Sequence, residues 1–163
     1  MQIKIDYLKN HPHLVSEISK WFFKEWGYLY PERDLASVEE AVAGRMNYDK
    51  IPLALVAVSD NNFVGTVCLK DYDMETRKDI SPWLAGLYVK EEFRNNGIGR
   101  LLVKNIIKKA KELGVDELYL YTPNAEKFYE KMGWCTINYE KYQETDVKIM
   151  RKSYDSPYSQ KKV

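Results

Sequence analysis

The 163-residue sequence contains only two cysteines and two histidines. Cys68 and Cys135 are too few and too isolated for a metal cluster or a disulfide scaffold. Both lie in strand-like contexts, so we expect buried, inert thiols and a reducing compartment. His11 and His13 flank Pro12 in a segment that reads as an exposed turn, which disfavours a catalytic role for either. No metal site is predicted.

Long apolar runs and an excess of one charge are also missing. No apolar stretch approaches the length of a membrane span, and residues 1–13 lack the apolar core of a signal peptide. The 25 basic and 24 acidic residues leave a net charge of +1. This balance gives no argument for binding nucleic acid or an anionic membrane. We therefore expect a cytoplasmic protein that binds neither, as a monomer or a homodimer.

The chain does contain enough apolar residues, 45%, for one sizeable core, and it shows no internal repeat or linker. Hydrophobic periodicity predicts strands over 2–8, 53–59, 63–70, 84–89, 115–121, 134–142 and 145–151. It predicts helices over 14–26, from a cap at Asp34 or Ser37 to about 47, over 98–113 and over 124–132. We expect residues 1–152 to form one domain and 153–163 a polar tail.

A basic, glycine-containing loop connects the strand over 84–89 to the helix that begins near residue 98. The first amides of a helix have no intrahelical partner, and together with the helix dipole they form an anion site. Gly97 and Gly99 leave room for a phosphate, and flanking arginines can fork onto its oxygens. The loop is therefore predicted to bind a diphosphate. The alternative is a helix start whose glycines serve only the turn.

Two common phosphate-binding designs do not fit this loop. A P-loop needs the run Gly-x-x-x-x-Gly-Lys-Ser/Thr, which the chain lacks. A Rossmann turn places its first glycine at the strand end, whereas seven residues separate Val89 from Gly97 here. That turn would also need a third glycine where Leu102 stands.

A third design does fit. Val89, Arg94, Gly97 and Gly99 resemble the acyl-CoA loop of GNAT-type N-acetyltransferases, Arg/Gln-x-x-Gly-x-Gly/Ala five residues after a strand-ending valine. The chain is similar to this family over nearly its whole length. The resemblance implies a GNAT fold of the α/β (α+β) class. This is a central mixed, mostly antiparallel sheet of about seven strands, with helices on both faces.

The resemblance also implies acetyl-CoA as cosubstrate. In the family, the strand before the loop splays from its neighbour, and its backbone pairs with the pantetheine arm. That strand maps here to Leu87, Tyr88 and Val89, and the amide of Leu87 or Val89 would stabilise the oxyanion. The diphosphate contacts implied by the loop are Arg94, Asn95, Asn96, Gly97, Ile98, Gly99 and Arg100. Lys104 could reach the adenosine 3′-phosphate, although a solvated surface lysine is favoured.

A second signature lies at residues 125–134, AEKFYEKMGW. It resembles the family stretch Ala-x-x-x-Tyr-x-Lys-x-Gly-Phe, whose tyrosine acts as general acid toward the departing thiolate. Tyr129 takes that place; the alternative is a tyrosine that only packs the helix onto the sheet. Many family members carry asparagine seven residues earlier, where this chain has Thr122. Asn124 is nearby but out of register, so the side chain that contacts the cofactor is left open.

The general base and the acceptor are not determined by the sequence. The acidic candidates are Glu25, Asp71, Asp73, Glu75 and Asp79, and a chain of waters could serve instead. An aromatic cluster is dense enough to wall a pocket: Trp21, Phe22, Phe23, Trp26, Tyr28 and Tyr30. The leading hypothesis is acetyl transfer from acetyl-CoA to a primary amine of a small molecule, by direct attack in a ternary complex. Protein acetylation, on a lysine or an amino terminus, and non-catalytic acyl-CoA binding are the alternatives.

Overall fold

The computed structural model describes residues 1–154, in which one seven-stranded sheet runs through the whole fold. Its strands are β1 (Lys4–Tyr7), β2 (Leu53–Ser59), β3 (Asn62–Lys70), β4 (Trp83–Val89), β5 (Glu117–Thr122), β6 (Cys135–Tyr142) and β7 (Thr145–Ser153). Their order across the sheet is β1-β2-β3-β4-β5-β7-β6. Every neighbouring pair is antiparallel except β4 and β5, which are parallel. The predicted mixed, mostly antiparallel sheet is confirmed.

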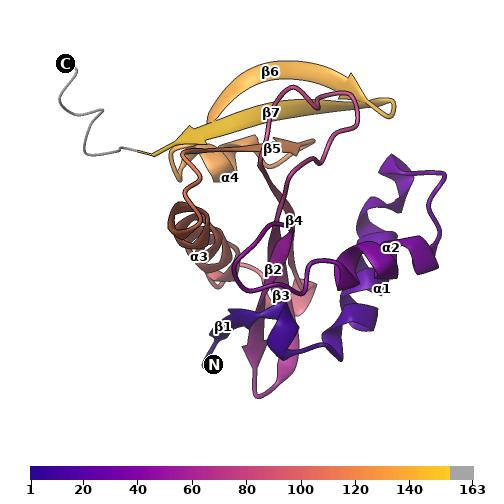
Figure 1. Ribbon diagram of the computed structural model, residues 1–163, viewed down its shortest axis with the longest axis vertical. Helices are drawn as coiled ribbons and strands as arrows, with labels where there is room; N and C mark the ends of the chain where they lie inside the picture. Colours follow the sequence, from indigo (N-terminus) through magenta and orange to yellow (C-terminus); the bar gives the residue numbers. More distant parts are fainter. Residues whose placement is uncertain (155–163) are drawn as a thin grey trace.

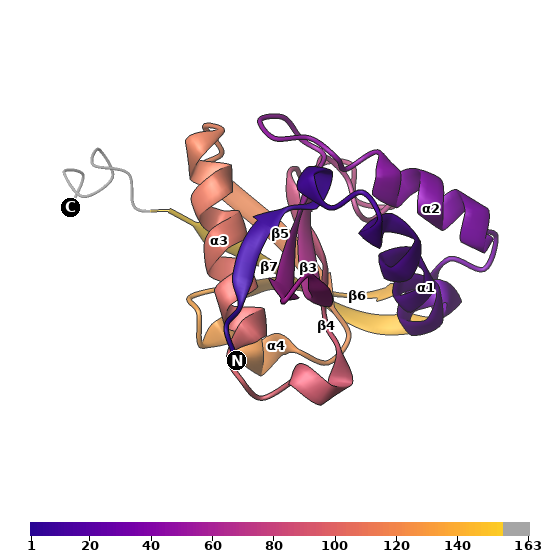
Figure 2. The ribbon, with the colours of Figure 1, turned by 90° about the horizontal axis from the view of Figure 1, so that it is seen from below.

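Helices cover both faces of this sheet, also as predicted. They are α1 (Leu14–Trp26), α2 (Leu35–Ala43), α3 (Ile98–Glu112) and α4 (Glu126–Glu130), with 3-10 turns η1 (Leu8–Asn10), η2 (Gly27–Leu29) and η3 (Glu91–Phe93). Figure 1 shows α1 and α2 on one side of β2–β4 and α3 on the other, and Figure 2 shows the same division from below. The two long helices, α1 and α3, begin where the periodicity predicts.

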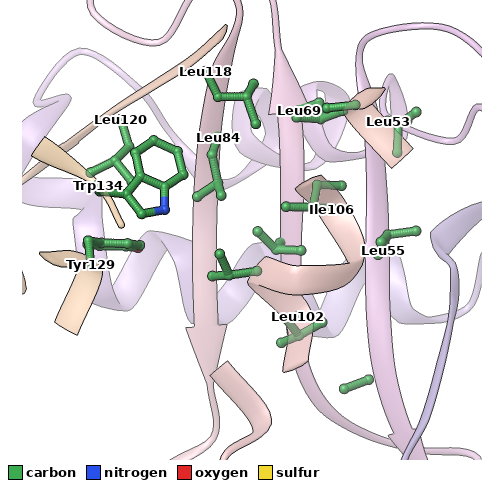
Figure 3. Packing of buried hydrophobic residues seen from close by; sticks show 14 of the residues in the cluster. Leu53, Leu55, Leu69, Leu84, Leu102, Ile106, Leu118, Leu120, Tyr129 and Trp134 are labelled. Carbon is green, nitrogen blue, oxygen red and sulfur yellow. The ribbon is translucent and has the colours of Figure 1, made fainter. Parts of the chain in front are cut away.

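Apolar stripes fix which way the long helices face. In α3, Leu102 and Ile106 are fully buried and pack onto β2, β3 and β4, as Figure 3 shows. In α1, Ile18 and Phe22 pack onto the opposite face together with Val56 of β2. Burying a side chain of this size stabilises the fold by about 1.5–3 kcal/mol. These two apolar layers hold the sheet between its helices.

The two parallel strands β4 and β5 diverge along most of their length. Only one residue pair, Trp83 and Tyr119, is in register between them, at the start of β4. Beyond it the strands separate, and Figure 1 shows β6 and β7 lying across the end of β2 and β3 rather than alongside them. Beyond Trp83, this edge of β4 therefore has no strand partner within residues 1–154.

A β-bulge in β4 accompanies this divergence. Against β3, Ala85 opposes Cys68 and Tyr88 opposes Thr66, so one extra residue is inserted in β4. Gly86 occupies the bulge with φ +60°, a left-handed conformation that costs other residues energy. A Cβ atom there would lie 3.1 Å from the ring of Phe22. Glycine is therefore required at this position for both its backbone and its lack of a side chain.

Several element ends differ from prediction. The first strand is shorter than 2–8, because the chain turns into η1 at Leu8. The second helix is capped by Asp34, whose carboxylate accepts a hydrogen bond from the Ser37 amide at 2.8 Å. It stops at Ala43, four residues short of 47, because the Arg45 carbonyl accepts the Ala54 amide at 3.0 Å and joins the start of β2.

Two expectations about burial were wrong. Cys68 is buried, and desolvation raises the pKa of its thiol, but Cys135 is exposed because it lies on the edge strand β6. The turn around Pro12 exposes His13 but not His11. His11 is buried, with its Nε2 3.0 Å from a carboxylate oxygen of Asp6 in β1.

The C-terminal boundary also shifts. Strand β7 continues through Ser153, and the Tyr154 amide donates to the Asp116 carbonyl at 3.2 Å. The start of the expected polar tail thus belongs to the sheet, and residues 155–163 lie outside the described residues.

A substitution at Gly86 should be more destabilising than one at a glycine with the same backbone conformation in open space. Gly114 has φ +80°, and apart from Gly114 itself and its two chain neighbours no atom is found within 4 Å of the point that a Cβ would occupy there. Gly114→Ala should lower the free energy of unfolding by about 1–2 kcal/mol, the cost of a left-handed residue. Gly86→Ala should lower it by about 2–5 kcal/mol, because the contact with Phe22 adds overpacking of about 1–3 kcal/mol. Urea unfolding measures both, and equal losses would contradict the packing argument.

Candidate functional site

A cleft enters the molecule where β4 and β5 diverge. Its inner cavity, of about 290 Å³, lies between β4, β5 and the end of α1. Its outer cavity, of about 380 Å³, lies between the end of β4 and the start of α3. Both are lined by Glu25, Trp26, Leu87 and Phe128, so they meet. The cleft therefore has two adjoining parts whose linings differ chemically.

The outer cavity brings together the loop residues that the sequence singled out. They are Leu87, Tyr88, Val89, Arg94, Asn95, Gly97, Ile98, Gly99 and Arg100. Asn96 does not line it: its amide donates to the carbonyls of Phe93 and Arg94 at 3.1 and 3.0 Å, which shapes the loop. Lys104 is exposed on α3 and lines neither cavity.

The start of α3 presents groups that can donate to an anion in this cavity. Gly97 caps the helix with φ +77°, and the first intrahelical bond runs from the Leu101 amide to the Gly97 carbonyl at 3.0 Å. The amides before Leu101 therefore have no intrahelical acceptor and can donate to a ligand. Arg94 and Arg100 are both exposed at the same cavity. Together these groups form a site suited to a phosphate or diphosphate.

Arg94 has a second role that the sequence did not indicate. Its Nε donates to the carbonyl of Val89 at 2.8 Å, and its guanidinium carbon lies 5.6 Å from the centre of the Tyr88 ring. These contacts connect the loop to the end of β4. Arg94 thus holds the loop in place as well as carrying charge.

The free edge of β4 runs along both cavities. Leu84 through Leu87 lie on one side of the inner cavity, and Leu120 through Thr122 of β5 lie on the other. An unpaired strand edge presents backbone donors and acceptors that an extended ligand can pair with. The cleft can therefore hold an elongated molecule with an anionic group at its outer end.

Tyr129 lies at the inner cavity, buried in α4 beside Trp134 (Figure 3). Its ring meets the Trp134 ring edge-on, with centroids 5.9 Å apart. Burial raises the pKa of its hydroxyl above the ordinary value, so the group is protonated at neutral pH. Within residues 1–154 its hydroxyl takes part in no side-chain hydrogen bond, which leaves it able to donate into the cavity.

Thr122 and Asn124 both line the inner cavity but differ in availability. The Thr122 hydroxyl accepts the Ala125 amide at 3.0 Å and so fixes the start of α4. Asn124 is exposed, and its side chain is the more accessible of the two.

The acidic candidates separate by position. Glu25 lines both cavities and Asp73 lines the inner one, where it forms an ion pair with Lys70 at 3.0 Å. Asp71, Glu75 and Asp79 line neither cavity. Asp79 is instead paired with Arg77 at 2.9 Å. Geometry thus leaves Glu25 and Asp73 as the acidic groups nearest the chemistry.

Aromatic residues of the predicted cluster do wall the inner cavity, but not all of them. Phe22, Phe23, Trp26 and Tyr30 line it, while Trp21 stacks on Tyr88 with centroids 5.5 Å apart, and Tyr28 is exposed.

Sequence reasoning missed Tyr121 and Arg45. The hydroxyls of Tyr30 and Tyr121 are hydrogen bonded at 2.7 Å. Burial, followed by the nearby Asp73 carboxylate, raises the pKa of both. Arg45 lines the cavity from the segment after α2. Alternation along β5 could have placed Tyr121, but no local pattern marks Arg45.

Along residues 1–154, every helix is too short or too polar to traverse a bilayer. Over the same part of the chain, His, Cys, Asp and Glu side chains nowhere gather in a group of three or more able to hold a metal ion.

Comparison with known sequences and structures gives consistent matches. Residues 15–134 match the family described as Acetyltransferase (GNAT) family. The chain is 44% identical over 57 residues to an uncharacterised N-acetyltransferase of Chlorobaculum tepidum, and 29% identical over 86 residues to N-alpha-acetyltransferase 30 of Schizosaccharomyces pombe. These matches cover 35% and 50% of this chain but only 36% and 57% of the two relatives.

A solved structure resembles nearly the whole fold. The chain superposes on an aminoglycoside 6′-N-acetyltransferase complexed with coenzyme A with a TM-score of 0.75. The similarity covers 96% of this chain and 99% of the other, at 21% sequence identity. At this identity the likeness establishes the fold.

Within residues 1–154 the Thr122 hydroxyl is hydrogen bonded and the Tyr129 hydroxyl is not, and this difference should appear in the stability of variants. Tyr129→Phe should change the free energy of unfolding by less than about 0.5–1 kcal/mol, because its hydroxyl has no protein partner to lose. Thr122→Val should cost about 1–3 kcal/mol, because it leaves the Ala125 amide without its acceptor. Urea unfolding of both variants tests this. A Tyr129→Phe loss as large as that of Thr122→Val would mean that the hydroxyl makes a structural bond.

Proposed function

Because the chain belongs to the acetyltransferase (GNAT) family, we propose that it transfers the acetyl group of acetyl-CoA to a primary amine of a small molecule, by direct attack in a ternary complex. The observation that carries this proposal is the cleft between β4 and β5. It joins an anion site at the start of α3 to an inner cavity that contains a protonated, buried tyrosine. A structural neighbour that was crystallised with coenzyme A supports the choice of cofactor.

The cleft fits the two chemically distinct parts of CoA. The free amides before Leu101, with Arg94 and Arg100, would hold the diphosphate. The free edge of β4 would pair with the amide groups of the pantetheine arm, as an added strand would. This arrangement would leave the reactive end of the cofactor near Leu87, where the two cavities meet.

When bound, acetyl-CoA supplies the thioester carbonyl that the amine attacks and a thiolate that leaves. An amide of Leu87 or Val89 on the free edge would stabilise the developing oxyanion. The Tyr129 hydroxyl would donate its proton to the sulfur. Its raised pKa keeps that proton in place at neutral pH, so the acid is present when it is needed.

The attacking amine must be neutral, so its proton has to leave before or during attack. Glu25 lines both cavities and is exposed, which suits it to accept that proton directly or through water. Asp73 is less suited, because its carboxylate is already paired with Lys70. We assign the base role to Glu25 or a water that it holds.

The shape of the inner cavity favours a small acceptor over a protein. Its walls come from α1, α2, β4 and β5, and aromatic rings line much of it. The alternative is acetylation of a protein amino terminus, for which the partial match to N-alpha-acetyltransferase 30 is the supporting observation. The second alternative is a non-catalytic acyl-CoA-binding domain, which would not need a proton donor such as the Tyr129 hydroxyl.

We also propose a cytoplasmic location and no partner among nucleic acids or membranes.

CoA binding should depend on Arg94 more than on a neighbouring surface cation. Arg94→Ala removes both the charge and the bond to the Val89 carbonyl, so we expect CoA affinity to fall by about 1.5–3 kcal/mol. Lys104→Ala, on the exposed face of α3, is the control and should change affinity by less than about 1 kcal/mol. Isothermal titration calorimetry measures both. Absence of CoA binding to the unmodified protein at millimolar concentration would refute the proposed function.

The acid role predicts a kinetic effect of Tyr129→Phe. Turnover should fall by about 10²–10⁴-fold, the usual contribution of a positioned acid. The loss should appear in kcat more than in KM, because the proton is needed only as charge develops on sulfur. CoA affinity should change little, since the ring still packs on Trp134. Steady-state release of thiol with any accepted amine tests this, and a variant with unchanged kcat would leave Tyr129 a packing residue.

A further inference from the structure

Arg45 is a buried cation whose charge is not matched by any neighbouring carboxylate. Only 8% of the residue is exposed, and it lines the inner cavity. Its guanidinium carbon lies 5.7 Å from the centre of the Phe22 ring. Within residues 1–154 no acidic side chain forms an ion pair with it, and its guanidinium donates no hydrogen bond.

This arrangement is unusual for a buried charge. Buried charges are normally paired, because their removal from water is costly. The contact with the Phe22 ring satisfies none of the five N–H donors of the guanidinium, because a ring carbon is not a hydrogen-bond acceptor of the usual kind. These N–H groups are therefore available to donate hydrogen bonds to a ligand in the inner cavity, which Arg45 lines.

Among the cations that line this cavity, Arg45 differs from the other two because it is both buried and without a carboxylate partner within residues 1–154. Lys70 is neutralised by Asp73 at 3.0 Å. Arg33 is exposed and stacks on Tyr30, 4.8 Å from the ring centre. Glu25 also lines the outer cavity, whereas Arg45 lines only the inner one.

We propose that Arg45 binds a carboxylate of the acceptor, so that the acceptor is an amino acid or another small amine that carries a carboxylate. The planar fork of a guanidinium matches the two oxygens of a carboxylate. This inference rests on the proposed function, since it names the class of amine that the enzyme acetylates.

The same charges argue against a polycationic acceptor such as an aminoglycoside. The inner cavity is lined by three basic side chains, Arg33, Arg45 and Lys70, and by two acidic ones, Glu25 and Asp73. An acceptor with several ammonium groups would face an unpaired guanidinium in a partly desolvated space, which is unfavourable. An acceptor with one ammonium and one carboxylate avoids this repulsion, because its carboxylate can pair with the guanidinium.

The test measures binding and turnover separately. Binding uses CoA-loaded protein and the N-acetyl derivatives of the common L-amino acids, each matched with its carboxamide, by isothermal titration calorimetry. The acid of at least one pair should bind roughly 10- to 150-fold more tightly than its amide, the range for a hydrogen-bonded charge. Arg45→Met should abolish this preference. Arg151→Met, which removes an exposed charge on β7, should retain it.

Turnover uses the parent amino acids, their carboxamides and their decarboxylated amines, with thiol release from acetyl-CoA as readout. We expect amino acids to have the lower KM, and Arg45→Met to raise that KM while the KM values of the carboxamides change little. Arg45→Lys keeps the charge but loses the fork, so its preference should be intermediate. If Arg45→Met does not fold, two other measurements test the proposal. They are the ratio of the KM values for the acid and the carboxamide in the unmodified protein, and the same ratio in Arg45→Lys.

The outcomes separate the two proposals. Thiol release with simple amines and no preference for carboxylates would overturn the role of Arg45 and leave the acetyltransferase proposal intact. Carboxylate binding that depends on Arg45, without thiol release from any acceptor, would overturn the acetyltransferase proposal but retain an anion site. A preference that survives Arg45→Met would also overturn the inference.

Discussion

The divergence of β4 and β5 is the constraint on which the rest of the structure depends. The two strands share a single registered pair, Trp83 with Tyr119, and then separate. If they paired along their length, their backbones would satisfy each other and the cleft would close. The bulge at Gly86 inserts one extra residue in β4 opposite β3, and bulges bend the strand that carries them. A flat, regular sheet of the same residues would have a complete core but no site.

Charge is distributed unevenly along the resulting cleft. The outer end has free amides and two exposed arginines, which suit a phosphate that keeps part of its hydration. The inner end has a buried arginine, and a protonated tyrosine lies at the same cavity. Interactions in the inner, less solvated part are stronger because the local dielectric constant is lower. On the proposed function, the acceptor would therefore be selected mainly by the groups at the inner end.

Several side chains serve the core and the site together. Phe22 of α1 packs in the core, lies against Gly86 in the bulge and contacts Arg45. Arg94 connects the loop to β4 and also faces the outer cavity. Substitutions at such residues change stability and binding at once. Variants on exposed faces, such as those at Lys104 or Arg151, are therefore needed as controls to separate the two effects.

The sequence by itself determined what depends on short spacings. The stripe of α3, the glycine loop before it and the segment around Tyr129 are each contained within about 20 residues, so periodicity and motif spacing were enough to find them. Tertiary structure decided what depends on distant segments: the hydrogen bond between the hydroxyls of Tyr30 and Tyr121, 91 residues apart, and the exposure of Cys135 on an edge strand. It also decided that Arg45 lines the cavity without an acidic partner. Whether a charge is paired depends on which segments meet around it, and no local pattern in a sequence contains that information.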